Sequence, residues 1–170
     1  MTKKYRDRPF SQRFSEMGDT AENVYKAVAP LGSTTRYGFR RPKGIKFTSI
    51  PETTRHMPDF FTSTYLVEVM GLGRDGILKS LKTGKYEALK VWNKVAKMTG
   101  LMGLVFFIWN SSEREWLVVA WETIVKEVSY SKRKYGIQKF ESDGNEYYRL
   151  DWERIRDKAL TVGRYDNEDD

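Results

Sequence analysis

The stretch PDFFTSTYLVEVMG, residues 58–71, decides the fold. Its two segments of strand-forming residues, 59–62 and 65–70, flank a turn at Ser63, which predicts a tight pair of strands. Because strand side chains alternate between the two faces, Leu66, Glu68 and Met70 share one face. The pattern therefore places an acidic side chain in the middle of an otherwise apolar strand, opposite the segment that opens with Asp59.

Helices are predicted on both sides of this strand pair. Residues 19–29 and 85–98 carry apolar side chains at helical spacing. The other expected elements are a basic extended segment at 33–47, a loop at 51–57, a short helix at 77–81, strands at 104–109 and 116–121, a short helix at 122–128, a hairpin of 137–140 with 146–150, and a final helix at 152–159 capped by Asp151. This order predicts an α/β domain with a single mixed central sheet flanked by helices.

Composition excludes several kinds of site. The chain has 170 residues, which suits one domain, and it has no cysteine. Disulfides, thiolate metal sites and a cysteine nucleophile are therefore ruled out, and His56 is the single imidazole. No apolar stretch is long enough to span a membrane, and residues 1–10 lack the apolar core of a secretion signal. We expect a cytoplasmic location, in a bacterial or phage-infected cell.

The distribution of charge indicates a polyanionic partner. The net charge is +7, although four acidic residues lie among the last five positions, so the rest of the chain is more basic still. We expect a basic N-terminal arm at 1–17, a domain at 18–162 and an acidic, disordered tail at 163–170. The candidates for nucleic-acid binding are Arg36, Arg40, Arg41 and Lys43.

The GLGRDG stretch, residues 71–76, has the spelling of a dinucleotide-binding loop. In that fold the third glycine lies inside the following helix, whereas the clear helix here begins nine residues later, at Lys85. The expected strand before it also carries Glu68 near its centre. We therefore interpret 71–76 as a loop.

Two carboxylates, those of Asp59 and Glu68, are the strongest candidates for chemistry. A buried, unpaired carboxylate is costly, so Glu68 needs a cation, a hydrogen-bond network or solvent. A hairpin that brings Asp59 beside Glu68 offers hard oxygen ligands that suit Mg²⁺ or Mn²⁺. An ion pair between Glu68 and a lysine or arginine explains the residue equally well, and the residues alone leave both interpretations open.

Pro58-Asp59, with Glu68 nine residues after Asp59, resembles the PD-(D/E)XK signature of the restriction-endonuclease-like and Holliday-junction-resolvase-like nucleases. The resemblance extends from about residue 18 to residue 121 and implies an αβββαβ core. It implies metal ligands at Asp59, Glu68, the Val69 carbonyl and Glu22 of the first helix. The expected cofactor is Mg²⁺, or Mn²⁺.

One position departs from the signature. The family places a lysine two residues after the second carboxylate, and this chain has Met70 there. Some members carry the lysine on the neighbouring helix, so Lys85 and Lys82 are the expected substitutes. His56, three residues before Asp59, is a loop residue that could lie near the site, although an imidazole without a role is the simpler interpretation.

The resemblance implies a metal-dependent endonuclease that hydrolyses phosphodiester bonds of double-stranded or branched DNA, in the manner of a junction resolvase or a phage or repair enzyme. The alternative is a non-catalytic nucleic-acid-binding member of the same fold, because of Met70. A third hypothesis is an unrelated basic α/β module that uses Glu68 only structurally. A homodimer would suit a resolvase, and Tyr147 and Tyr148 are the expected interface.

Overall fold

The computed structural model describes residues 20–38, 44–72, 77–78, 81–141 and 144–166. An N-terminal helix covers residues 20–28. The further elements, in chain order, are β1 (Thr35–Arg36), the 3₁₀ turn η2 (Phe47–Ser49), α2 (Glu52–Arg55), β2 (Phe60–Phe61), β3 (Tyr65–Gly71), α3 (Thr83–Met98), β4 (Gly103–Asn110), β5 (Glu115–Ala120), α4 (Trp121–Tyr135), β6 (Gln138–Lys139), β7 (Glu146–Tyr147), α5 (Trp152–Arg156) and β8 (Thr161–Arg164).

The main sheet has the strand order β1-β2-β3-β4-β5-β8. Strands β3 and β4 are parallel and are connected through α3, whereas the other neighbouring pairs are antiparallel. Strands β6 and β7 form a separate hairpin. The α/β class with a mixed central sheet is therefore confirmed.

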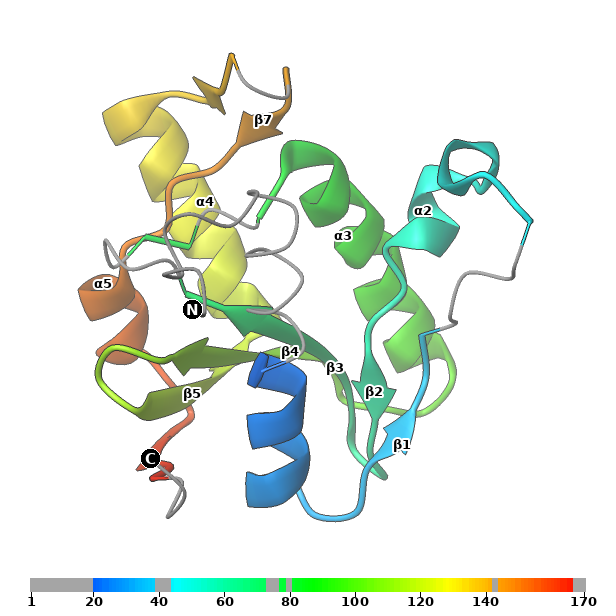
Figure 1. Ribbon diagram of the computed structural model, residues 1–170, viewed down its shortest axis with the longest axis vertical. Coiled ribbons are helices and arrows are strands. Elements are labelled where there is room, and N and C mark those ends of the chain that lie inside the picture. Colours follow the sequence, from blue (N-terminus) through cyan, green and yellow to red (C-terminus); the bar gives the residue numbers. More distant parts are fainter. Residues whose placement is uncertain (1–19, 39–43, 73–76, 79–80, 142–143, 167–170) are drawn as a thin grey trace, which may run out of the picture.

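Helices cover both faces of this sheet (Figure 1). Leu66 and Met70 of β3 pack in one apolar cluster with side chains of α3, α4 and α5. Val67 and Val69 of β3 pack in a second cluster with the N-terminal helix. Alternation along β3 thus follows the predicted faces, and Glu68 belongs to the face that α3 covers.

Most of the predicted elements are present. The helices at 19–29 and 85–98, the strand pair at 59–70, the strands at 104–109 and 116–121 and the hairpin at 137–150 correspond to observed elements, within a few residues at each end for the described residues. Their strong periodicity or uninterrupted apolar character explains this agreement, because each one buries a continuous face.

Three predictions about the remaining segments are wrong. The expected loop at 51–57 contains α2, whose side chains are exposed or half-buried and therefore leave no apolar pattern. The expected short helix at 122–128 is the first half of α4, which continues through a polar last turn to Tyr135. Residues 77–78 form no helix, because Ile77 makes an isolated bridge to Asp151.

The end of the chain also differs from expectation. Helix α5 ends at Arg156 instead of 159, and β8, which was not predicted, follows it. Asp151 holds the N-cap position of α5 without a side-chain cap, because its carboxylate accepts hydrogen bonds from Tyr135 and Arg149. The expected tail at 163–170 overlaps β8, and residues 167–170 lie outside the described ranges, as does the arm at 1–17.

The helices in the described ranges do not include one whose length and apolar character would allow it to cross a membrane.

Candidate active site

The β2–β3 hairpin brings Asp59 and Glu68 together. Phe60 is the register partner of Val67, and Phe61 is that of Leu66, so continuing the register sets Asp59 opposite Glu68. Side chains of directly opposed residues lie on the same face of a sheet. The Val69 backbone N–H donates a 2.8 Å hydrogen bond to Asp59 Oδ2, which fixes the carboxylate beside β3.

Thr62 holds the hairpin turn, a role that sequence reasoning missed. Its hydroxyl oxygen accepts hydrogen bonds from the backbone N–H groups of Thr64 and Tyr65, at 3.1 and 3.0 Å. Its own N–H donates to the Tyr65 carbonyl at 2.9 Å. Threonine before a Ser-Thr pair is a recognisable turn signal. These bonds set the register that places Asp59 opposite Glu68.

The cation at the site is Lys85, from the first turn of α3. Its ammonium group forms an ion pair with Glu68 Oε1. The Glu68 side chain is 2% exposed, whereas that of Lys85 is 20% exposed, so solvent reaches the pair from the lysine side. Of the two expected substitutes, the structure brings Lys85 to the carboxylates. Lys82 instead bridges to Tyr147 through its backbone, with its ammonium 5.9 Å from that ring's centroid.

Met70 occupies a core position. It is 2% exposed and packs in the apolar cluster beneath α3 and α4. A lysine there would bury an ammonium among hydrocarbon side chains. The site therefore obtains its cation from the helix that follows β3.

Burial and charge shift the pKa values of all three groups. Burial, reinforced by the nearby Asp59 carboxylate, raises the pKa of Glu68 to about 8 despite its contact with Lys85. Burial likewise raises the pKa of Asp59, although Lys85 and the Val69 N–H oppose that change. Burial alone would lower the pKa of Lys85, but the two carboxylates outweigh it and raise the pKa. Lys85 thus stays charged, whereas burial and the neighbouring Asp59 disfavour the ionised form of Glu68.

Glu22 lies close enough to influence the site but has its own partner. Its carboxylate accepts a 2.5 Å ion-paired hydrogen bond from Arg36, whose guanidinium lies 5.2 Å from the Phe60 ring centroid. The negative charge of Glu22 contributes to the raised pKa of both Asp59 and Glu68. The structure thus places Glu22 and Arg36 beside the two carboxylates, as a neighbouring pair.

Helix α2 carries His56 to the same region. Burial is the main cause that lowers the pKa of His56 to about 4, and the positive charges of Lys85, Arg55 and Lys82 add to it. The imidazole is therefore neutral at physiological pH. Helix α2 also packs on the start of α3, where a Cβ at position 84 would clash with Glu52 Oε1, so Gly84 permits this close approach.

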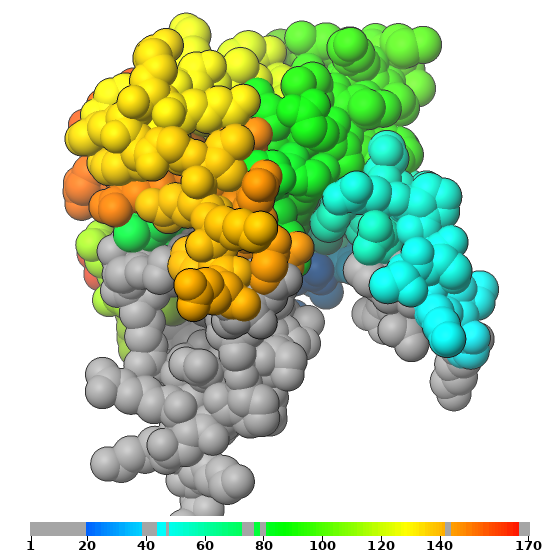
Figure 2. Space-filling view, turned by 90° about the horizontal axis from the view of Figure 1, so that it is seen from above, coloured from blue at the N-terminus to red at the C-terminus, as the bar shows by residue number. Residues whose placement is uncertain are grey.

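A hollow is visible where these segments meet. Figure 2 shows it between the segment that contains α2 and the β6–β7 hairpin with the start of α3. Arg40, Arg41, Lys43 and residues 73–76 of the glycine-rich loop lie outside the described residues.

The predicted dimer interface is wrong. Tyr147 and Tyr148 are 8% and 3% exposed, because they pack inside the molecule against Phe140 and Tyr86 respectively. An aromatic pair in a hairpin resembles an exposed patch in sequence, and the fold buries it.

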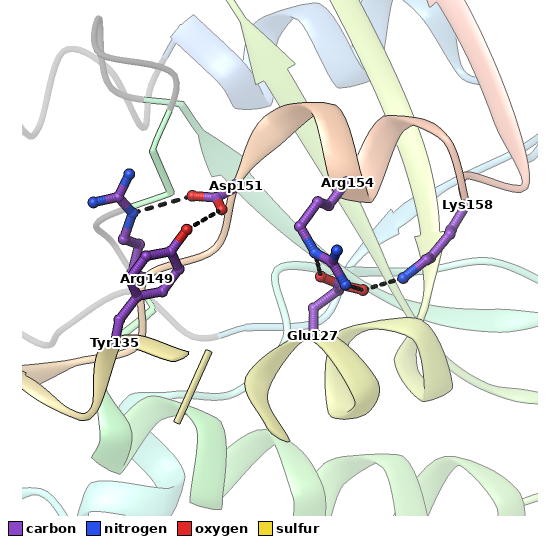
Figure 3. A network of polar contacts seen from close by, with 6 residues as sticks. All are labelled: Glu127, Tyr135, Arg149, Asp151, Arg154 and Lys158. Atoms are coloured by element: carbon purple, nitrogen blue, oxygen red, sulfur yellow. Dashed lines mark hydrogen bonds and ion pairs between the residues drawn. The ribbon is translucent and has the colours of Figure 1, made fainter. Parts of the chain in front are cut away.

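An ordinary structural ion pair elsewhere in the molecule shows how the site differs. The buried carboxylate of Glu127 receives two cations, Arg154 through hydrogen bonds of 2.8 and 3.3 Å and Lys158 through an ion pair (Figure 3). Burial opposes these contacts, yet they lower the pKa of Glu127. At Glu68 the ratio of carboxylates to cations is reversed, because two carboxylates share one ammonium.

The residues present fit a divalent cation. Glu68 Oε2 is buried without a hydrogen-bond partner, beside a second carboxylate and an excess of negative charge. In an extended strand the C=O of Val69 faces the same side as its N–H, toward Asp59. Within the described ranges no group of three or more His, Cys, Asp or Glu residues is close enough to hold a metal ion. A cation here would depend on two carboxylates, the Val69 carbonyl and water, a donor set that Mg²⁺ accepts.

No protein-family model, curated protein or solved structure matches this chain.

Proposed function

We propose that the protein is a metal-dependent endonuclease that hydrolyses phosphodiester bonds of double-stranded or branched DNA. The observation that carries the proposal is the cluster of Asp59, Glu68 and Lys85. The carboxylate of Asp59, just before β2, that of Glu68 on β3 and the ammonium of Lys85 on α3 share a mostly buried site with two carboxylates for one ammonium.

The order of elements supports the same proposal. The N-terminal helix precedes three strands, β1, β2 and β3, which are followed by α3 and a parallel strand β4. Apart from η2 and α2, which lie between β1 and β2, this is the αβββαβ order that the PD-(D/E)XK resemblance implies. In that arrangement both carboxylates and the helix lysine meet at β3, which agrees with the contacts described above.

Each residue has a chemical role in the proposed reaction. Asp59 and Glu68 would hold Mg²⁺, with the Val69 carbonyl as a further ligand, and the Val69 N–H keeps the Asp59 carboxylate in place. Such a metal would supply a water of lowered pKa and positive charge to offset that of the phosphate. Lys85 keeps its proton because of the two carboxylates, so it donates a hydrogen bond and positive charge at the reacting phosphate.

A second candidate function is DNA binding without cleavage, and Met70 is the observation that favours it. Position 70 lies in the core, so the signature lysine is absent and Lys85 alone replaces it. If the Lys85–Glu68 pair persists when DNA is bound, the lysine has only a structural role.

A cleavage assay tests the proposal. Supercoiled, linear and four-way-junction DNA are incubated with the protein in Mg²⁺, Mn²⁺ or EDTA, and binding is measured separately by fluorescence anisotropy in EDTA. We expect cutting only with metal. Asp59→Asn and Glu68→Gln should bind DNA normally yet cut at least about a thousandfold more slowly.

Glu127→Gln is the matched control, because it neutralises an equally buried glutamate away from the site. Tight DNA binding with no cutting in Mn²⁺ would establish the second candidate function. Cutting that survives Glu68→Gln unchanged would reject the proposed site.

A further inference from the structure

The last turn of α4 concentrates positive charge. It contains Lys132, Arg133 and Lys134, which we call the α4 basic cluster. All three side chains are exposed, and the segment from Ser129 to Tyr135 holds no acidic residue. Basic residues in a last helical turn complement the helix dipole, so their position alone does not indicate a ligand.

Aromatic rings lie beside the two lysines of the cluster. The ammonium of Lys132 lies 5.1 Å from the ring centroid of Tyr148, and that of Lys134 lies 5.1 and 5.4 Å from those of Tyr135 and Tyr130. A cation–π contact positions a cation without neutralising it. Among the described residues, no carboxylate forms an ion pair with the cluster, in contrast to the Arg154 and Lys158 pairs on Glu127. Lys132 and Lys134 therefore lie against aromatic rings and retain their charge.

The cluster is connected to the candidate active site. Tyr148, beneath Lys132, donates its N–H to the Leu81 carbonyl at 3.2 Å, just before α3 begins. Its ring also meets that of Tyr86 edge-on, at 5.3 Å between centroids. Tyr86 is the residue after Lys85, so a short series of contacts joins the α4 basic cluster to the start of α3. In Figure 1 the β6–β7 hairpin lies at the same end of the molecule as the starts of α2 and α3.

We propose that the α4 basic cluster binds the phosphate backbone of duplex DNA and so directs a neighbouring phosphate toward Lys85 at the start of α3. This inference rests on the proposed function, because it names the surface that positions the substrate. The charge of the cluster, the ring contacts of its two lysines and its location suit a contact to DNA phosphates. Such contacts supply affinity and position the protein on the duplex without recognising the base sequence.

The test compares two double variants that each remove two positive charges. Lys132→Ala/Lys134→Ala changes the cluster, and Lys94→Ala/Lys97→Ala changes the far half of α3. Anisotropy of a short labelled duplex DNA is measured in EDTA over a range of salt concentrations, so that no cutting occurs. We expect the cluster variant to bind about tenfold more weakly and its salt slope to fall by about two. The α3 variant should stay within about twofold of the unmodified chain.

Several results would overturn the inference. Unchanged binding by the cluster variant would do so, as would equal losses in both variants, which would indicate a general effect of net charge. A duplex RNA of the same sequence that binds at least about tenfold more tightly than DNA, and loses affinity in the cluster variant, would assign the surface to RNA. Selective loss of DNA binding in a chain that never cleaves DNA would support this inference while rejecting the proposed function.

Discussion

Glu68 on β3 and Glu127 on α4 are equally buried, each 2% exposed, yet they have opposite electrostatics. Glu127 has two cationic partners, and its pKa is lowered. Glu68 shares one ammonium with Asp59, and its pKa is raised to about 8. The first arrangement is a complete structural ion cluster that attaches α5 to α4. The second has one ammonium for two carboxylates, and this imbalance is the observation on which the proposed metal site rests.

The largest expected effect separates Lys85 from an ordinary surface lysine. Lys90 lies on the same helix and pairs with Glu87 at 2.9 Å, with both side chains well exposed. We expect Lys85→Ala to slow DNA cleavage about a thousandfold, because it removes the cation at the reacting phosphate. Lys90→Ala should change the rate less than about twofold. The measurement is single-turnover DNA cleavage with Mg²⁺. Equal rates for the two variants would show that Lys85 has only a structural role.

Adding a second cation beside Glu68 tests whether the site accepts the arrangement found at Glu127. Met70→Lys places an ammonium in the core two residues along the same face. We expect a loss of about 3 kcal/mol in the free energy of unfolding, measured with urea, because the charge is buried among apolar side chains. We also expect no rescue of cleavage in the Lys85→Ala background. Restored cleavage would show that position 70 reaches the site.

Neutralising Glu127 should weaken the fold without affecting catalysis. In Glu127→Gln the cationic partners lose their carboxylate, and we expect a cost of about 2 kcal/mol. Because the pKa of Glu127 is lowered in the folded state, its contribution is present above pH 4.5 and is lost as the pH falls. The measurement is urea unfolding between pH 3 and 7, scored as the difference from the unmodified chain. A difference that grows toward acid pH would contradict the assignment.

The smallest expected effect is on the stability of Glu68→Gln, and its sign is opposite to that expected for Glu127→Gln. An acid whose pKa is raised on folding contributes stability that is present below its unfolded pKa and is lost as the pH rises. For Glu68 this window extends from 4.5 to about 8. In EDTA we expect Glu68→Gln to be more stable than the unmodified chain by about 1 kcal/mol at pH 8.5, with the difference vanishing near pH 4. If Glu68→Gln is instead less stable than the unmodified chain at pH 8.5, Glu68 stabilises the fold as Glu127 does, and the prediction is wrong.

The strand pair and the lysine show how far the sequence leads at the site. Alternation along residues 65–70 predicted the face of Glu68, and the turn at Ser63 predicted its partner Asp59. The choice between Lys82 and Lys85 required coordinates, because the two lysines straddle the start of α3 and only the helix phase directs Lys85 onto Glu68. Other features of the site also required coordinates, because they join residues distant in sequence. They are the ion pair of Glu22 with Arg36, the hydrogen bond from Val69 to Asp59, and the packing of α2 on α3.

The sequence by itself determined the α/β class, the major helices and strands, and the pair of acidic positions, because those features follow from periodicity within one segment. Only the tertiary structure decided which charges balance. In the sequence, Glu68 and Glu127 are both single glutamates within patterns of apolar residues, and nothing there distinguishes them. Their pKa values diverge because burial and charge act through space, and the cations that reach each carboxylate come from elements 17 to 31 residues away in the chain.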